Sequence, residues 1–416
     1  MPSPETTHRT NVHWPSALQF GLSILAIISL WLTALPLVVL GLVQYFNHAV
    51  PPGEAISLLL ISTGVAFIGI LLIPSAGYSL VRLLGHPIPK ARSLPGIIHP
   101  ALIIIILPIV IGLGYGISKI DAVAWILLPI FHILAIGLPV LLLVYIALRG
   151  LPLGSSQRTW GTFGSGAILA PAISFTVEGL ALIALILLWA LSVSLQPEIV
   201  SELTSLAEQL QNAPPSPEAI TGILAPYMTS PGVLLAVFAF VAVIVPLIEE
   251  LIKPIGVWLL AGRNLTPVAG FVAGTLCGAG YALVESLLLS SSAETWAVLV
   301  TVRIGTAMIH ILSTGLMGWV LALTWREGRY IRLGVTYLSV VLLHAMWNSL
   351  TLLTVISSLS ASYPDLLEYG ILSQLGVLAP FGIGTLSIFA FLALIWVNSF
   401  LRRAHVDETH SGTVVV

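Results

Sequence analysis

The stretch VPLIEELIKPIG, residues 245–256, places two adjacent carboxylates and an ammonium group inside an otherwise apolar run. On a helix, Glu249 and Lys253 are four residues apart and Glu250 and Lys253 are three apart, so either glutamate can pair with the lysine. A single charged side chain near the middle of a bilayer costs about 2.5–3.5 kcal/mol on insertion scales. Three such groups within five residues therefore indicate a functional site.

Three later apolar runs carry further polar side chains in pairs. Residues four or seven positions apart lie on one face of a helix, so each pair is presented in one direction. The motif sequences are GYALVES and HAMWN for the first and last pair. The pairs are Tyr281 with Glu285, Arg303 with His310, and His344 with Asn348.

The depth of these residues in a bilayer follows from the helical rise of about 1.5 Å per residue. This count places Glu249, Glu250, His310 and His344 around the bilayer centre, with Glu285 somewhat nearer the outside. Buried charges must find partners, so the least costly arrangement brings the four runs together around one hydrated cavity.

The donor set suggests one kind of chemistry. Two neutral imidazoles and a carboxylate from separate helices match the ligands of a catalytic Zn²⁺ that keeps one position open for water. Glu285, His310 and His344 are the predicted metal ligands. The predicted catalytic residues are Glu249, Glu250, Lys253, Asn348 and Arg303.

These catalytic residues are compatible with two mechanisms of amide hydrolysis, one with a metal ion and one without. With a metal, one glutamate of the pair is the general base, and Asn348 or Arg303 stabilises the oxyanion of amide hydrolysis. Without a metal, Glu249 or Glu250 activates water directly, while Lys253 holds the other glutamate ionised. Both schemes predict peptide-bond hydrolysis within the membrane, and the sequence does not choose between them or between the two glutamates.

The amino-acid composition indicates that the chain lies in a lipid bilayer. Hydrophobic residues make up 57% of the chain and charged residues 8%, against roughly 25% charged residues in soluble domains. The long apolar runs are sufficient to cross about 30 Å of hydrocarbon as helices. We therefore predict an all-α, polytopic membrane protein with ten spans, near residues 17–45, 56–83, 98–117, 122–148, 166–193, 232–260, 267–289, 297–323, 333–356 and 371–399.

The distribution of Lys and Arg predicts the orientation. If the N-terminus is cytoplasmic, twelve of the fifteen basic residues fall in cytoplasmic pieces. The outer loops then hold only Lys119, and Lys253 and Arg303 lie within spans. We therefore expect both termini in the cytoplasm. No basic tract indicates nucleic acid, and the single cysteine, Cys277, excludes an intramolecular disulfide.

Four regions follow from this pattern. Residues 1–193 form a five-span region without an assigned role, and residues 194–231 form an acidic extracytoplasmic loop. Residues 232–360 form the predicted catalytic core, and residues 361–416 form the last span and a cytoplasmic tail. The loop begins with PEIVSELTSLAEQLQ, whose apolar spacing predicts an interfacial helix that NAPPSP then ends.

Two ionisable residues in the first region stand alone in their spans. They are His132 and Glu178, and neither has another charged residue within its predicted span. We expect each to be a satisfied polar group or a packing hydrogen bond.

The ordered set EELIK, YALVE, STGLMG after His310, and HAMWN resembles the PrsW family of intramembrane proteases, over roughly residues 240–350. It is more distantly similar to the CAAX prenyl protease and Abi superfamily, whose pattern is a Glu-Glu pair, an aromatic-xxx-His and a His-xxx-Asn. The resemblance implies an intramembrane peptidase that cleaves a membrane protein, such as a single-span anti-sigma factor, in a bacterial-type plasma membrane.

The resemblance also implies site residues. Glu249, Glu250 and Lys253 occupy the family's Glu-Glu-x-x-Lys, His310 and His344 match its two histidines, and Asn348 completes His-xxx-Asn. Glu285 stands where the wider superfamily has histidine. Ser286 and Leu289 depart from the Glu-Asn-x-x-Tyr that PrsW-like sequences often show, so the surrounding hydrogen bonds are expected to differ.

Two other functions remain open from the sequence. A non-catalytic scaffold of the same superfamily would use the polar core to assemble partners. A proton- or ion-coupled transporter would use intramembrane Glu, His and Lys as a relay, although the sequence shows no internal repeat of the kind common in transporters.

Overall fold

The computed structural model describes residues 13–91, 99–214, 216–228, 230–289, 295–362 and 370–411. Within these ranges it contains helices and no named strand, and ten helices are long and apolar enough to cross a membrane. The ten predicted spans and the all-α fold are confirmed. The protein is an integral, multi-pass membrane protein, and the side of the membrane on which its termini lie stays a prediction.

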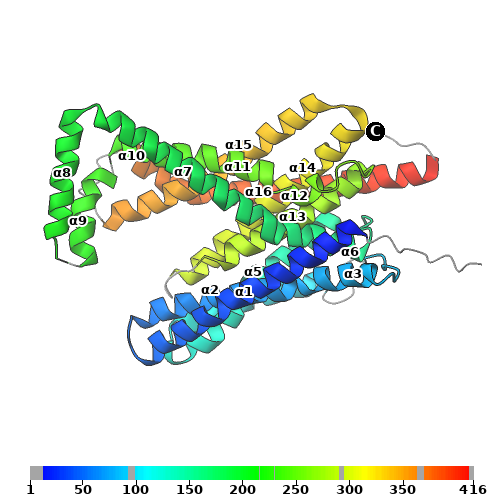
Figure 1. The fold of residues 1–416 in the computed structure, drawn as a ribbon, viewed down its shortest axis with the longest axis horizontal. Helices are drawn as coiled ribbons and strands as arrows, with labels where there is room; N and C mark the ends of the chain where they lie inside the picture. The colour runs from blue at the N-terminus through cyan, green and yellow to red at the C-terminus, as the bar shows by residue number, and fades with distance from the viewer. Residues whose placement is uncertain are drawn as a thin grey trace, which may run out of the picture.

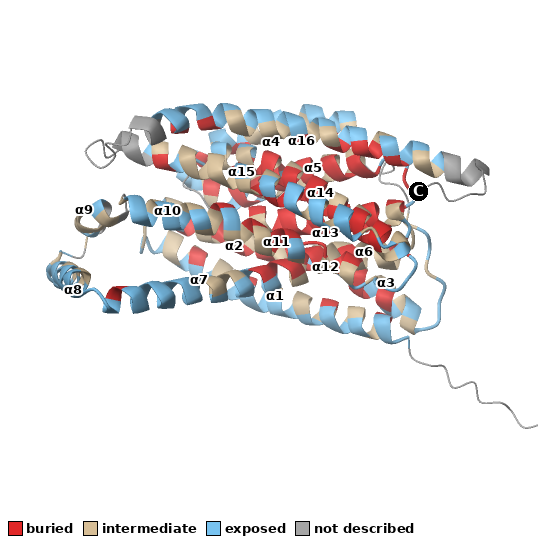
Figure 2. Cartoon of the chain, turned by 90° about the horizontal axis from the view of Figure 1, so that it is seen from above, coloured by how far each residue is buried: buried red, intermediate tan, exposed pale blue. Residues whose placement is uncertain are grey.

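The first five helices form one layer of the molecule (Figure 1). Helix α1 packs along α2 and α3, and α4 packs along α5. Figure 2 shows most of α1 as exposed, and its exposed side chains are largely leucines, valines and isoleucines, as expected of a surface that faces lipid. The five are α1 (Trp14–Phe46), α2 (Pro52–Leu71), α3 (Ile73–Leu83), α4 (Pro100–Ser118) and α5 (Asp121–Leu148).

The fifth span leads out of this layer. It consists of α6 (Ser156–Gly164), a π-helical turn η2 (Ser165–Leu169) and α7 (Ala170–Ser194), which crosses the molecule towards the loop of residues 194–231 (Figure 1). The loop contains α8 (Pro197–Asn212) and α9 (Pro217–Met228), which project beyond the bundle. The predicted loop helix is therefore confirmed, and the chain leaves it at the expected proline-rich break.

The sixth span is a broken helix. It runs through α10 (Pro231–Ala239), a π-helical turn η3 (Phe240–Ile244), α11 (Val245–Ile252) and the short α12 (Ile255–Trp258). Prolines lack the N–H that continues a helix, and here Pro246 follows the π-turn while Pro254 separates α11 from α12. Irregular backbone at membrane depth is tolerated where protein surrounds it, and α11 packs against α7 and α15.

Helices α13 (Pro267–Leu287) and α14 (Trp296–Glu327) form the centre of the molecule. In their most hydrophobic windows, 89% and 83% of residues are buried, against 11% in α1, and Figure 2 shows the two helices largely in the buried colour. Helix α15 (Tyr330–Ser362) packs on α14 and on η3, and α16 (Gly370–Ser411) packs on α15 and α14. The candidate site residues thus lie on this central pair and on α11 and α15, which pack against α14.

Glycines allow α13 and α14 to approach each other closely. A Cβ atom on Gly278 would lie 2.5 Å from the backbone oxygen of His310, and one on Gly274 would clash with the backbone oxygen of Thr314. Small residues at four-residue spacing permit this kind of contact between membrane helices. The contact fixes the backbone of His310 against α13.

Candidate active site

Three charged side chains lie next to the break in the sixth span and are buried in the interior of the protein. Glu249, Glu250 and Lys253 are all buried, and the side chain of Lys253 is fully enclosed. Lys253 Nζ lies 2.8 Å from Glu249 Oε2 and 2.7 Å from Glu250 Oε1. The predicted pairing is confirmed, and the lysine contacts both glutamates at once.

The same ammonium also contacts two histidines from other helices. Lys253 Nζ lies 2.8 Å from His310 Nδ1 on α14 and 3.3 Å from His344 Nδ1 on α15. An ammonium has three N–H donors, and the three shortest contacts go to Glu249, Glu250 and His310. The contacts with Glu250 and His310 are hydrogen bonds, whereas the contact with Glu249 is an ion pair, because Glu249 Oε2 has no hydrogen-bond partner among the described residues. The contact with His344 Nδ1 is the longest of the four, and this nitrogen has a closer partner.

That partner is Glu250. His344 Nδ1 lies 2.9 Å from Glu250 Oε1, and since a carboxylate oxygen can only accept, Nδ1 carries the proton and donates it. The other ring nitrogen, Nε2, then keeps its lone pair and lies 3.8 Å from Glu249 Oε2. His344 is thus held by Glu250 and presents Nε2 towards Glu249.

His310 is held in a similar way. Its Nδ1 accepts from Lys253, so Nε2 carries the proton and donates to Glu285 Oε2 on α13 at 2.6 Å. Glu285 also forms an ion pair with Arg303, whose Nη2 lies 2.9 Å from Glu285 Oε2, and Arg303 Nε donates to Ser286 Oγ at 3.0 Å. Arg303 thus holds Glu285, and both groups orient His310 from the side away from Lys253.

Tyr281 closes one side of the cluster. Its ring lies 4.9 Å from Lys253 Nζ, and its centroid lies 5.4 Å from that of His310 in an edge-on contact. The rings of His310 and His344 also meet edge-on, with centroids 5.3 Å apart. Because the phenol ring stabilises a cation over its face, Tyr281 supports the position of the ammonium.

Asn348 lies outside these contacts. Its Nδ2 donates to the backbone oxygen of Val241 in η3 at 2.9 Å. In a π-helical turn this oxygen would accept from residue 246, which is Pro246 and has no N–H. The structure thus places Asn348 as the substitute donor for a carbonyl that the proline leaves unpaired.

Three residues of the cluster could hold a metal ion. One ligand atom from each of Glu249, His310 and His344 lies within 4.8 Å of the others, and all three residues are buried. Two imidazoles and a carboxylate suit Zn²⁺. Ligating histidines usually donate the other ring N–H to a carboxylate, as these two do to Glu285 and Glu250.

These residues can hold a metal ion on the condition that Lys253 moves. The ammonium of Lys253 contacts the same atoms, so an ion bound by Glu249 and His310 Nδ1 requires Lys253 to give up those two contacts. The group also differs from the predicted set in one residue. Glu249 takes the place that the sequence analysis gave to Glu285, which instead orients His310.

Glu178 on α7 is a residue that the sequence analysis placed outside the site. We expected a satisfied polar group, but its Oε1 is buried without a hydrogen-bond partner in the described residues. Its carboxylate interacts electrostatically with Glu249, Lys253 and Glu285. The only sequence signal was an acidic residue in an apolar run, and nothing in the spacing linked it to the later spans.

For His132, the expectation of a satisfied polar group is confirmed, since its Nδ1 accepts from Trp296 Nε1 at 3.2 Å.

Comparison with known proteins adds one finding. A family model described as PrsW family intramembrane metalloprotease matches residues 157–380, more than half of the chain. The match includes α6 and α7 in addition to the spans from α10 to α15. No curated protein and no solved structure matches the chain.

Proposed function

The chain belongs to the PrsW family of intramembrane metalloproteases, and from this premise we propose that its catalytic centre is the cluster around Lys253. The cluster comprises two glutamates and a lysine from the sixth span and one histidine from each of α14 and α15. The protein is therefore an intramembrane protease, and in this proposal the cluster hydrolyses a peptide bond of a membrane-protein substrate.

One observation carries the assignment to these residues. Each histidine has one ring nitrogen fixed by a carboxylate from a different helix, so the other nitrogen faces the interior of the cluster. Such fixed imidazoles are costly to assemble within apolar surroundings, and they hold their reactive nitrogens in one orientation. A structural ion pair would need neither histidine.

Glu249, His310 and His344 would hold the metal. A divalent ion such as Zn²⁺ supplies Lewis acidity there, towards a water and towards the carbonyl of the scissile bond. Glu285 and Glu250 orient the two imidazoles in either metal state. Lys253 supplies the positive charge that two adjacent buried carboxylates require.

Glu250 is the proposed general base. Its Oε1 is held by Lys253 and His344, while its Oε2 is buried and has no hydrogen-bond partner in the described part of the chain. Oε2 is thus the atom free to take a proton from the attacking water, and it then passes that proton to the leaving amine nitrogen. Arg303 and Asn348 are both engaged elsewhere, so we assign them positioning roles.

We extend the proposal to the substrate and the membrane. A site enclosed by membrane-spanning helices suits a substrate that is itself a span, so we propose a single-span protein, of which an anti-sigma factor is one example. The bias of Lys and Arg supports an orientation with both chain termini in the cytoplasm, and membership of the family is the basis for proposing a bacterial-type plasma membrane.

The test compares wild type with Glu250→Gln in proteoliposomes that contain tagged single-span proteins. New peptide termini are identified by mass spectrometry, and bound metal is measured in each preparation. The matched control is Glu54→Gln, which changes an exposed glutamate at the start of α2.

We expect wild type and Glu54→Gln to cleave. Glu250→Gln should fold and lose cleavage by about 100-fold or more even at saturating metal, and its metal affinity should fall by about 10–100-fold because Glu250 also holds His344. Undiminished cleavage by Glu250→Gln would reject Glu250 as the base. Undiminished cleavage by His344→Ala as well would reject the whole cluster.

A further inference from the structure

A second cavity of about 1110 Å³ lies apart from the catalytic cluster. Its walls come from α1, the start of α3, α6, η2 and the end of the sixth span around α12. None of the residues around Lys253 lines it. Helix α1 begins at this end of the molecule, α6 begins there, and the turn after α12 passes there, so the cavity opens at the end that is cytoplasmic in the predicted orientation.

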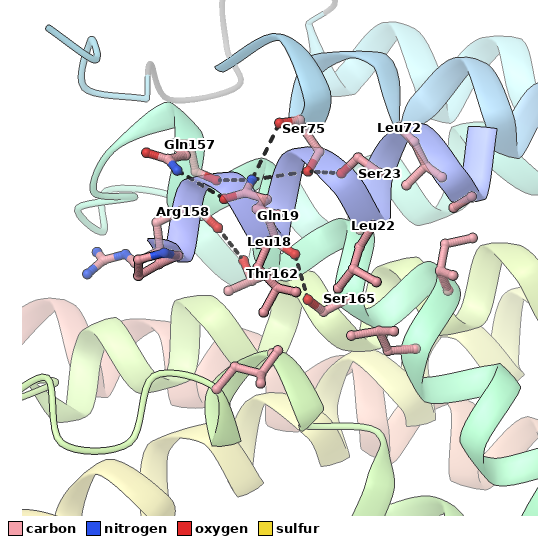
Figure 3. A pocket seen from close by; sticks show the side chains of 18 of the residues that line it. Leu18, Gln19, Leu22, Ser23, Leu72, Ser75, Gln157, Arg158, Thr162 and Ser165 are labelled. Carbon is pink, nitrogen blue, oxygen red and sulfur yellow. Dashed lines mark hydrogen bonds between the residues drawn. The ribbon is translucent and has the colours of Figure 1, made fainter. Parts of the chain in front are cut away.

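A hydrogen-bond network at one end of this cavity joins three elements. Gln19 Nε2 on α1 donates to Ser75 Oγ on α3 at 3.1 Å and to the backbone oxygen of Gln157 on α6 at 3.1 Å. Gln157 Nε2 returns a bond to Gln19 Oε1 at 3.1 Å. Figure 3 shows these side chains together above Thr162. The network fixes the helices around the cavity, which is therefore preformed.

The other end of the cavity is apolar. Figure 3 shows Leu22 and Leu72 there, away from Gln157 and Arg158, and Leu25 and Ile168 also contribute to the wall. Leu22 and Leu25 belong to the exposed face of α1. This end is thus open to the hydrocarbon of the bilayer along α1, and a ligand can enter it from the membrane.

Two guanidinium groups give the polar end its charge. Arg158 and Arg263 line the cavity, and no Asp or Glu is among the described residues that line it. Neither arginine forms an ion pair with a described residue. Two unpaired arginines beside an apolar wall are complementary to an anionic head group that carries a hydrocarbon tail.

We propose that this cavity binds an anionic phospholipid of the cytoplasmic leaflet. Its phosphate pairs with Arg158 and Arg263, and one acyl chain lies along the apolar wall from Leu22 to Leu25. The chemical basis is that arginine recognises phosphate through charge-assisted hydrogen bonds, and basic pockets between spans on the cytoplasmic side are typical sites for anionic head groups.

The test uses the full-length protein, purified in detergent and stripped of lipid. Native mass spectrometry measures retention of palmitoyl-oleoyl-phosphatidylglycerol, with the zwitterionic phosphatidylcholine of the same chains and soluble glycerol phosphate as the two comparison ligands. The variants are Arg158→Gln/Arg263→Gln and the control Arg82→Gln/Arg403→Gln. The control changes two exposed arginines that do not line the cavity and carry the same total charge.

We expect wild type and the control to retain one phosphatidylglycerol, and the cavity variant to bind it about thirtyfold more weakly, as two lost arginine contacts imply. Equal retention of both lipids, or equal losses in both variants, would overturn the proposal. Glycerol phosphate that binds as well as the lipid would overturn the role of the apolar wall. A second variant, Ala26→Trp, fills that wall and should reduce lipid retention while leaving the arginines in place.

Discussion

The ammonium of Lys253 lies 2.8 Å from His310 Nδ1, one of the atoms of the candidate metal site. The lysine therefore occupies the place of a metal ion between Glu249 and His310, two of the three candidate metal ligands. A buried ammonium that contacts two carboxylates balances charge that would otherwise be costly within the membrane. Metal binding and this lysine contact are thus alternatives at His310, and several consequences can be measured.

Replacing Lys253 by methionine tests this competition. Without the ammonium, Glu249 and Glu250 are buried next to each other with no cation, so we expect the metal-free variant to lose about 3–5 kcal/mol of stability. A divalent ion should restore most of that loss. The measurement is thermal unfolding with chelator and with added Zn²⁺, compared with wild type. A variant that is equally stable in both conditions would contradict the shared cation position.

Glu285 is expected to act on the metal through His310. Glu285→Gln weakens the acceptor for His310 Nε2 and leaves Arg303 without its carboxylate. Loss of such a partner typically reduces metal affinity by about 10–100-fold. Metal titration of the purified variant measures this directly. Glu327→Gln, at a pair with Arg329 outside the cluster, is the control and should bind metal as wild type does.

Asn348 is expected to be needed for folding more than for chemistry. Asn348→Leu leaves the Val241 oxygen without a donor, since Pro246 cannot supply one. An unsatisfied buried carbonyl costs about 1–3 kcal/mol, so unfolding should occur at lower denaturant concentration. Asn47→Leu, at the exposed end of α1, is the control. If Asn348→Leu keeps full stability and loses cleavage, the catalytic role given to Asn348 by the sequence analysis is restored.

The contact between α13 and α14 predicts a steric effect. Gly278→Ala introduces a methyl group 2.5 Å from the backbone oxygen of His310, so α14 must shift. Overpacking of this kind costs about 1–3 kcal/mol, and the shift also displaces His310 from Lys253. We expect lower stability together with weaker metal binding. Gly112→Ala is the control, because a Cβ atom there meets no other atom within 4 Å.

The sequence was sufficient for the spans and for the meeting of the four central site residues. Uninterrupted apolar runs predicted all ten helices, because hydrocarbon requires this length and composition. Counting residues along each run also predicted the meeting of Glu249, Glu250, His310 and His344, because depth is fixed by helical rise.

The partners within the site could not be predicted in the same way. Depth does not specify how each helix is rotated, so we predicted Glu285 as the metal ligand, whereas in the structure Glu285 accepts from His310 Nε2 and Glu249 lies beside His344 Nε2. The π-turn before Pro246 further rotates α11 relative to α10. Such a turn depends on the Asn348 amide of a distant helix, which single-sequence patterns do not reveal.

Glu178 gives the last prediction, because it approaches the cluster from a helix that the sequence analysis left without a role. Its buried Oε1 has no hydrogen-bond partner among the described residues, and when ionised its carboxylate adds negative charge to that of Glu249 and Glu285. Glu178→Gln removes that charge. Metal affinity should fall by roughly three- to tenfold, since like-signed carboxylates attract a divalent cation jointly. Stability should be unchanged or slightly higher, because repulsion between the carboxylates is relieved.

The measurements are metal titration and thermal unfolding of the same preparation, with Glu198→Gln on the exposed α8 as control. A large loss of stability would show that Glu178 has a structural partner. Unchanged metal affinity would show that its charge does not reach the cluster, and in either case α7 would be only a wall of the site.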